Sequence, residues 1–192
     1  MASQPDFGGN IPQGGAYPAG GGYAQDDDIS SAADHASRHA GESTDRSLFS
    51  SLVGSLSQKK QSLSEEEIDE DDAVKQHKRY FDKDDDDNDA DDKSMGSAAA
   101  MQALKMFTSQ SSSAPESNSQ SAFIGLAMAE ASKLFDQKAS EGKVSSESSK
   151  ESAVMKAGEM ALKMYLKSGS GASESSAGSA SGLLNLAAKF IK

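Results

Sequence analysis

The chain has 192 residues, a formal net charge of −11 and no cysteine, and only 35% of its residues are hydrophobic. The lack of cysteine excludes disulfides, thiolate metal sites and a cysteine nucleophile. The net acidity argues against nucleic-acid binding, which needs basic surface to contact phosphates. With no tryptophan and 6% aromatic residues, the composition predicts a modest helical core with substantial disorder.

The first 25 residues are rich in Gly, Pro and Gln. We expect a disordered head here, because such a composition leaves little to bury. The opening MASQPDFGGNIPQGG has neither a basic nor an apolar region, so we expect no signal peptide. No run of about 18 apolar residues follows, which predicts no transmembrane segment. These expectations favour a cytoplasmic protein, with the nucleus as a second location.

Residues 26–81 are predicted to form an N-terminal region of three helices. The first carries a stripe of small apolar residues between three aspartates and Gly41: Ile29, Ala32, Ala33, Ala36 and Ala40. Acidic residues before a helix and a glycine after it are typical of helix ends. The second helix, in TDRSLFSSLVGSLSQKKQ, has an amphipathic pattern.

The third helix of this region is predicted to start at Ser64, where Ser64–Glu67 forms a capping-box pattern. Val74, His77 and Phe81 then fall on one face, and we expect them to form an apolar edge on a charged helix. The helix should end near Asp82, where a run of aspartates begins.

The run DKDDDDNDADDK, residues 82–93, is predicted to be an acidic linker, because like charges repel and aspartate is a poor helix former. With Asp82 at position one of an EF-hand loop, Asp84 and Asp86 fit positions three and five. However, Asp87 stands where the loop needs glycine and Lys93 where it needs the bidentate glutamate. We therefore expect weak attraction of divalent cations at most.

Residues 94–192 repeat a short phrase, seen in AAAMQALKMF and again in GEMALKMY. Aligned on Lys105, Lys133, Lys163 and Lys189, four Ala-rich segments follow one another at spacings of 28, 30 and 26 residues, with Ser/Gly-rich connectors. This spacing predicts four degenerate helix-plus-loop units. We expect the methionines to fill gaps in an Ala-rich core, with an adaptable groove for partner helices as the alternative: Met101, Met106, Met128, Met155, Met160 and Met164.

The unit ESAVMKAGEMALKMYLK separates polar from small residues. Its polar stripe is Ser152, Lys156, Glu159, Lys163 and Lys167, and the opposite stripe is Val154, Ala157, Gly158, Ala161 and Tyr165. Small residues on one face let neighbouring helices approach closely, which partly offsets the shortage of large side chains.

The sequence contains no convincing catalytic or metal-binding pattern. His35 and His39 are four residues apart, but no glutamate follows His35, and His77 is in another segment. Serine is too abundant for any one serine to be identified as a nucleophile. The Gly/Ser-rich segment around Gly169–Gly171 lies in a predicted connector and does not form a nucleophile elbow. We expect no cofactor and no enzymatic activity.

Several phrases together resemble the fungal beta-flanking proteins: ADHASRHAGES, SLFSSLVGSL, AFIGLAMAEASKLFD, AVMKAGEMALKMYLKS and GLLNLAAKFIK. The match runs from about Asp26 to Lys192 in the same order. The resemblance implies an intracellular helical fungal protein with a domain of unknown function, and it carries over no catalytic residue. The aspartate block after Phe81 departs from the Gly/Ser-rich connector that the resemblance implies.

We therefore predict an all-α protein, a small irregular bundle of short Ala/Ser-rich helices that acts as a non-enzymatic interaction or structural module, through an unknown protein partner or self-association. A stress-protective hydrophilic protein is the first alternative, and a peripheral membrane-surface binder, through LLNLAAKFIK, is the second. The candidate packing and interaction face consists of Leu48, Phe49, Leu52, Val53, Leu56, Phe107, Phe123, Met128, Phe135, Val154, Gly158, Ala161, Tyr165 and Phe190.

Overall fold

The computed structural model describes residues 29–41, 45–82, 90–110, 119–170 and 188. The predicted head, most of the acidic linker, and all of the fourth Ala-rich segment except Ala188 lie outside this part of the chain. Within it the protein is all-α, as predicted, with six α-helices and no strand. None of the helices in the described ranges is long and apolar enough to cross a membrane.

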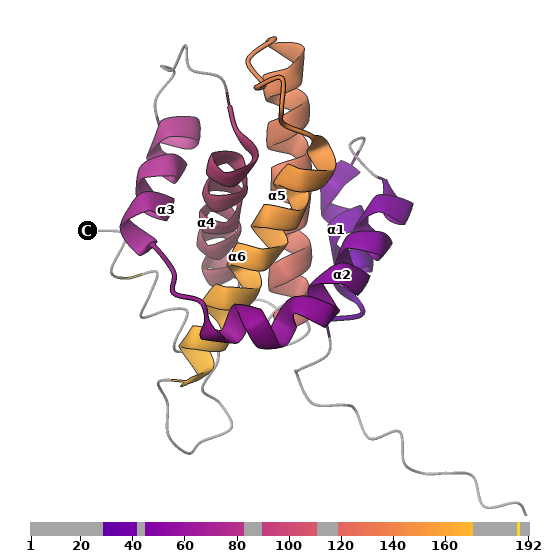
Figure 1. The fold of residues 1–192 in the computed structure, drawn as a ribbon, viewed down its shortest axis with the longest axis vertical. Helices are drawn as coiled ribbons and strands as arrows, with labels where there is room; N and C mark the ends of the chain where they lie inside the picture. The colour runs from indigo at the N-terminus through magenta and orange to yellow at the C-terminus, as the bar shows by residue number, and fades with distance from the viewer. Residues whose placement is uncertain (1–28, 42–44, 83–89, 111–118, 171–187, 189–192) are drawn as a thin grey trace, which may run out of the picture.

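Three C-terminal helices form the centre of the fold and three N-terminal helices surround them (Figure 1). The centre consists of α4 (Asp92–Gln110), α5 (Gln120–Ser140) and α6 (Lys150–Ser170), which pack against one another. Around it, α1 (Ala32–Ala40) lies on α5, α2 (Arg46–Glu65) contacts α1 and α6, and α3 (Glu70–His77) lies on α4.

The main apolar core takes side chains from both halves of the sequence. Phe49 and Leu56 of α2 are fully buried together with Phe123 and Ile124 of α5 and Leu162 of α6. Phe107 and Phe123 meet with ring centroids 5.2 Å apart. The regions before and after the acidic run therefore share one core.

Two glycines allow the helices to approach very closely. A Cβ atom added at Gly125 of α5 would lie 2.5 Å from the carbonyl oxygen of Ala32 in α1 and 2.5 Å from the Cβ of His35. At Gly96 of α4, an added Cβ would lie 2.6 Å from the Cβ of Lys156 in α6. Close approach through small residues increases the number of dispersion contacts, which is how a core poor in large side chains gains packing energy.

The end of α1 matches the prediction, but the start of α3 does not. Gly41 follows α1 with a φ of 61°, a conformation that favours glycine. The predicted capping box at Ser64 is wrong, because α2 continues to Glu65 and the Ser64 hydroxyl donates to the carbonyl oxygen of Gln61. Asp69 caps α3 instead, accepting from the backbone N–H of Asp72.

The predicted apolar edge of the third helix is confirmed only in part: Val74 is half-buried and packs against the main core, but Phe81 does not join it. Ala73 is the residue of α3 that is buried, while Phe81 is 37% exposed and stacks on His77. His77 is half-buried and its Nε2 lies 2.9 Å from Oε1 of Gln102 in α4. The chain changes to a π-helical turn over Lys78–Asp82, which alters the helical register that the prediction assumed.

The start of α4 is fixed by two sets of hydrogen bonds. The carboxylate of Asp91 accepts from the backbone N–H of Ser94 at 3.0 Å, so an aspartate of the acidic run caps the helix. Ala90 donates to the carbonyl oxygen of Lys143 at 2.7 Å and accepts from Ser145 at 3.0 Å. This backbone bridge attaches the beginning of α4 to the loop between α5 and α6.

Candidate functional site: a lysine-lined pocket between three helices

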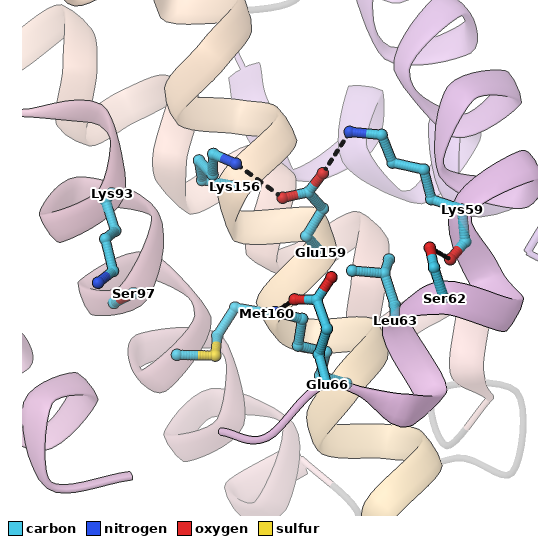
Figure 2. A pocket seen from close by; sticks show the side chains of 10 residues that line it. Lys59, Ser62, Leu63, Glu66, Lys93, Ser97, Lys156, Glu159 and Met160 are labelled. Atoms are coloured by element: carbon cyan, nitrogen blue, oxygen red, sulfur yellow. Dashed lines mark hydrogen bonds and ion pairs between the residues drawn. The ribbon is translucent and has the colours of Figure 1, made fainter. Parts of the chain in front are cut away.

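A pocket of about 380 Å³ opens where α2, α4 and α6 meet (Figure 2). Four lysines, two glutamates and two serines line it together with two apolar side chains: Lys59, Lys93, Lys156, Lys163, Glu66, Glu159, Ser62, Ser97, Leu63 and Met160. Its size is at the lower end of the range for small-molecule sites, roughly 300–1,000 Å³.

Glu159 of α6 lies between two of the lysines. Lys59 of α2 donates to one carboxylate oxygen at 2.8 Å and Lys156 donates to the other at 3.1 Å, as Figure 2 shows. The Glu159 side chain is only 10% exposed. Burial raises the pKa of this carboxyl, but the two lysine hydrogen bonds outweigh the burial, and the pKa lies below its ordinary value.

The same interaction affects Lys59. Its hydrogen bond to Glu159 raises the pKa of the ammonium above its ordinary value. Both members of the pair are therefore charged over a wide pH range. The pair joins α2 to α6 on one side of the pocket.

The second glutamate forms a further link between these helices. Lys163 of α6 donates to the carboxylate of Glu66, which follows directly after α2. Glu66 remains about half exposed, with 54% of its side chain accessible, whereas Lys163 is 17% exposed. Lys163 is thus held at the pocket while its partner carboxylate faces solvent.

The fourth lysine comes from α4 and differs from the others. Across the described part of the chain, the Lys93 ammonium makes no ion pair or hydrogen bond. Ser97, one helical turn further on, lies on the same face of α4 and lines the same pocket. Lys93 and Ser97 therefore contribute hydrogen-bond donors to the pocket that no described residue uses.

The charge of the pocket is opposite to that of the chain. Four lysines and two glutamates give the lining a formal charge of +2, although the whole chain carries −11. An excess of ammonium groups around a concave surface attracts small anions electrostatically.

The predicted interaction face lies inside the core. Most of its members are buried, and Leu48 and Phe135 are half-buried. Phe190 lies outside the described residues. The buried members are Phe49, Leu52, Val53, Leu56, Phe107, Phe123, Met128, Val154, Gly158, Ala161 and Tyr165.

The histidines are placed apart. His35 and His39 are on α1, and His77 is on α3, on the other side of the central helices (Figure 1). No group of three or more His, Asp or Glu side chains in the described ranges is arranged to hold a metal ion. The aspartates at the centre of the EF-hand comparison, within residues 83–89, lie outside those ranges.

The sequence indicated three of the six charged residues that line the pocket. The polar stripe of α6 contains Lys156, Glu159 and Lys163, all of which line it. The contributions of Lys59 and Lys93 were missed, because the two lysines lie on two other helices, α2 and α4. Their meeting point depends on how α2 and α4 cross α6, which the local sequence does not reveal.

A family model described as a domain of unknown function (DUF7721) matches residues 28–112. The matched stretch contains α1 to α4 and therefore supplies Lys59 and Lys93, but not the pocket residues of α6. Neither the curated proteins nor the solved structures gave a match to this chain.

Proposed function

We propose that the protein is a non-enzymatic helical interaction module that is already folded before it meets a partner. The close contact of Gly125 with Ala32 is the observation that carries this proposal. It needs α1 and α5 to be packed face to face, although they are far apart in the sequence. A chain that becomes ordered only on drying or on binding does not need a glycine at a close contact between two of its own helices.

Partners are proposed to bind the polar outer surface of the module. The large apolar side chains predicted for an interaction face are mostly buried within the chain's own core. Among the described residues, Phe81 is the large hydrophobic side chain that remains exposed. Charged and polar residues must then provide most of the recognition, which suits a reversible interaction better than an obligate one.

The stress-protective alternative rests on the mean hydropathy of −0.61 and the abundance of small polar residues. Far-ultraviolet circular dichroism of the full chain in dilute buffer separates the two functions. We expect a helical spectrum that is lost cooperatively on heating. A coil spectrum that gains helix only in dehydrating solvent would support the protective protein and overturn the folded module.

We also propose that the chain is related to the fungal beta-flanking proteins and acts in the cytoplasm or nucleus. Support comes from the ordered series of resembling phrases, two of which, ADHASRHAGES and SLFSSLVGSL, fall within the matched residues 28–112. Fluorescence microscopy of the tagged full chain in a fungal cell tests the location. Signal confined to a membrane-bound organelle other than the nucleus would contradict it.

A further inference from the structure

We propose that the pocket between α2, α4 and α6 is a binding site for a small phosphomonoester anion. This inference goes beyond the interaction module proposed above and does not depend on it. The ligand would enter between Lys93 of α4 and Lys163 of α6, with Ser97 as a neutral donor.

Ion pairs between helices account for only some of the lysines that line the pocket. Glu159 neutralises one charge of the pair Lys59 and Lys156, and Glu66 neutralises Lys163. A purely structural role explains these contacts, since each glutamate ties α2 to α6. It does not explain why α4 adds Lys93, which has no partner among the described residues.

The remaining charge fits a phosphomonoester. The lining keeps a formal charge of +2 after its two glutamates are counted, and a phosphomonoester carries about −1.5 to −2 at neutral pH. Its three terminal oxygens accept several hydrogen bonds at one point, and lysine is a common point-charge partner for phosphate. The cavity of about 380 Å³ leaves room for a small organic group on the phosphate.

The electrostatic surroundings make this site distinctive. Residues 1–93 carry a net charge of −13, whereas residues 94–192 carry +2. Neither segment is strongly basic, and in the described part of the chain four lysines converge at this pocket. Binding should weaken as ionic strength rises, since the Debye length falls to about 10 Å at 0.1 M salt.

Isothermal titration calorimetry of the full chain with glycerol 3-phosphate tests the proposal. We expect saturable binding at low ionic strength and at least about tenfold weaker binding of succinate, which places its two charges on separate groups. Sedimentation with phosphatidylcholine vesicles containing phosphatidic acid asks whether a lipid headgroup supplies the same phosphate. Binding that requires Lys93 in either experiment supports the site, whereas binding in neither overturns it.

Three variants check that the pocket is responsible. Lys93→Ala should weaken glycerol 3-phosphate binding about tenfold or more, because it removes a charge-assisted hydrogen bond. Lys105→Ala, on an exposed position of the same helix, should leave binding unchanged. Glu66→Gln should tighten binding several-fold, because it releases Lys163 from its carboxylate.

Lys93→Ala and Glu66→Gln are expected to change the affinity for glycerol 3-phosphate in opposite directions. A general loss of structure would weaken binding in both variants. Lys93 and Glu66 are both exposed, so neither change should unfold the protein, and circular dichroism confirms that the helices remain. Equal binding by Lys93→Ala and the parent chain, or weaker binding by Glu66→Gln, would overturn the proposal. A chain that melts cooperatively but ignores phosphate would keep its proposed function as an interaction module and lose the site.

Discussion

Lys59 of α2 and Glu159 of α6, which are 100 residues apart in the sequence, form a 2.8 Å hydrogen bond between oppositely charged groups. The pair joins the surrounding helices to the central ones at the edge of the main core. Because the carboxylate is largely buried and the ammonium half-exposed, its contribution to stability is moderate and depends on pH.

The acid sensitivity of folding should depend on Glu159. Its folded pKa lies below the ordinary value of 4.5, so its stabilising effect is present above about pH 4.5 and is lost as the pH falls through the folded pKa. Glu159→Gln should lower the free energy of unfolding by about 1 kcal/mol at pH 7, and this loss should shrink as the pH falls through the folded pKa of Glu159. Urea denaturation across this pH range measures the difference.

Glu147→Gln provides the matched control. Glu147 is exposed in the loop before α6 and makes no ion pair within the described part of the chain. Its removal should leave the pH profile of stability unchanged. An equal loss at pH 3 and pH 7 for Glu159→Gln would show that the effect does not come from the charge.

Gly125→Ala should destabilise the protein even though alanine is the better helix former. The added methyl group would meet Ala32 and His35 at distances that no relaxed structure tolerates. Overpacking of this kind costs roughly 1–3 kcal/mol, which outweighs a propensity gain of about 1 kcal/mol. Thermal melting should show a lower Tm for the variant.

The same substitution at Gly54 of α2 should act in the opposite direction. An added Cβ there has no neighbour within 4 Å, so Gly54→Ala gains helix propensity without a clash and should stabilise by up to about 1 kcal/mol. If Gly125→Ala raised the Tm as Gly54→Ala does, the close packing of α1 on α5 would be wrong.

Phe49→Ala should be among the most damaging single changes in α2. The ring is 0% exposed in the core shared by both halves, and truncating a buried phenylalanine typically costs about 3–5 kcal/mol. Phe81→Ala, at an exposed ring on α3's π-helical extension, should cost far less. Denaturant midpoints compare the two, and similar losses would contradict the assigned burial.

Ser119→Ala should weaken the start of α5. The Ser119 hydroxyl oxygen accepts from the backbone N–H of Ala122 at 3.1 Å, and loss of such a cap costs about 1 kcal/mol. Ser119→Asp keeps an acceptor at the same place and should retain most of the stability. If Ser119→Ala and Ser119→Asp unfold at the same denaturant concentration, the cap contributes nothing.

The sequence predicted which face of α6 would be buried, but not how the helices meet. On α6, Val154 and Ala161 are buried and Lys156 lines the pocket, as the separation of polar and small residues indicates. Periodicity reports the side of a helix that avoids water and contains no information on the partner helix. The crossing of α2 and α4 over α6, and with it the pocket, therefore needed the structure.

Helix ends were predicted less well, because several residues competed for the same role. Ser64 and Asp69 both have side chains suited to capping, and the structure uses Asp69. Asp91 belongs to a run predicted to stay extended by repulsion, yet it caps α4. Tertiary contacts select one candidate, since the Ala90–Lys143 hydrogen bond places α4 relative to the loop after α5.

The central claim is that the helices on both sides of the acidic run fold as one unit. Native-state hydrogen exchange of the full chain, followed by mass spectrometry in low denaturant, tests it most directly. We predict that buried amides of α2 and α6 open with the same free energy and the same denaturant dependence. Rapid exchange of α1 to α3 while α4 to α6 stay protected would contradict the shared core.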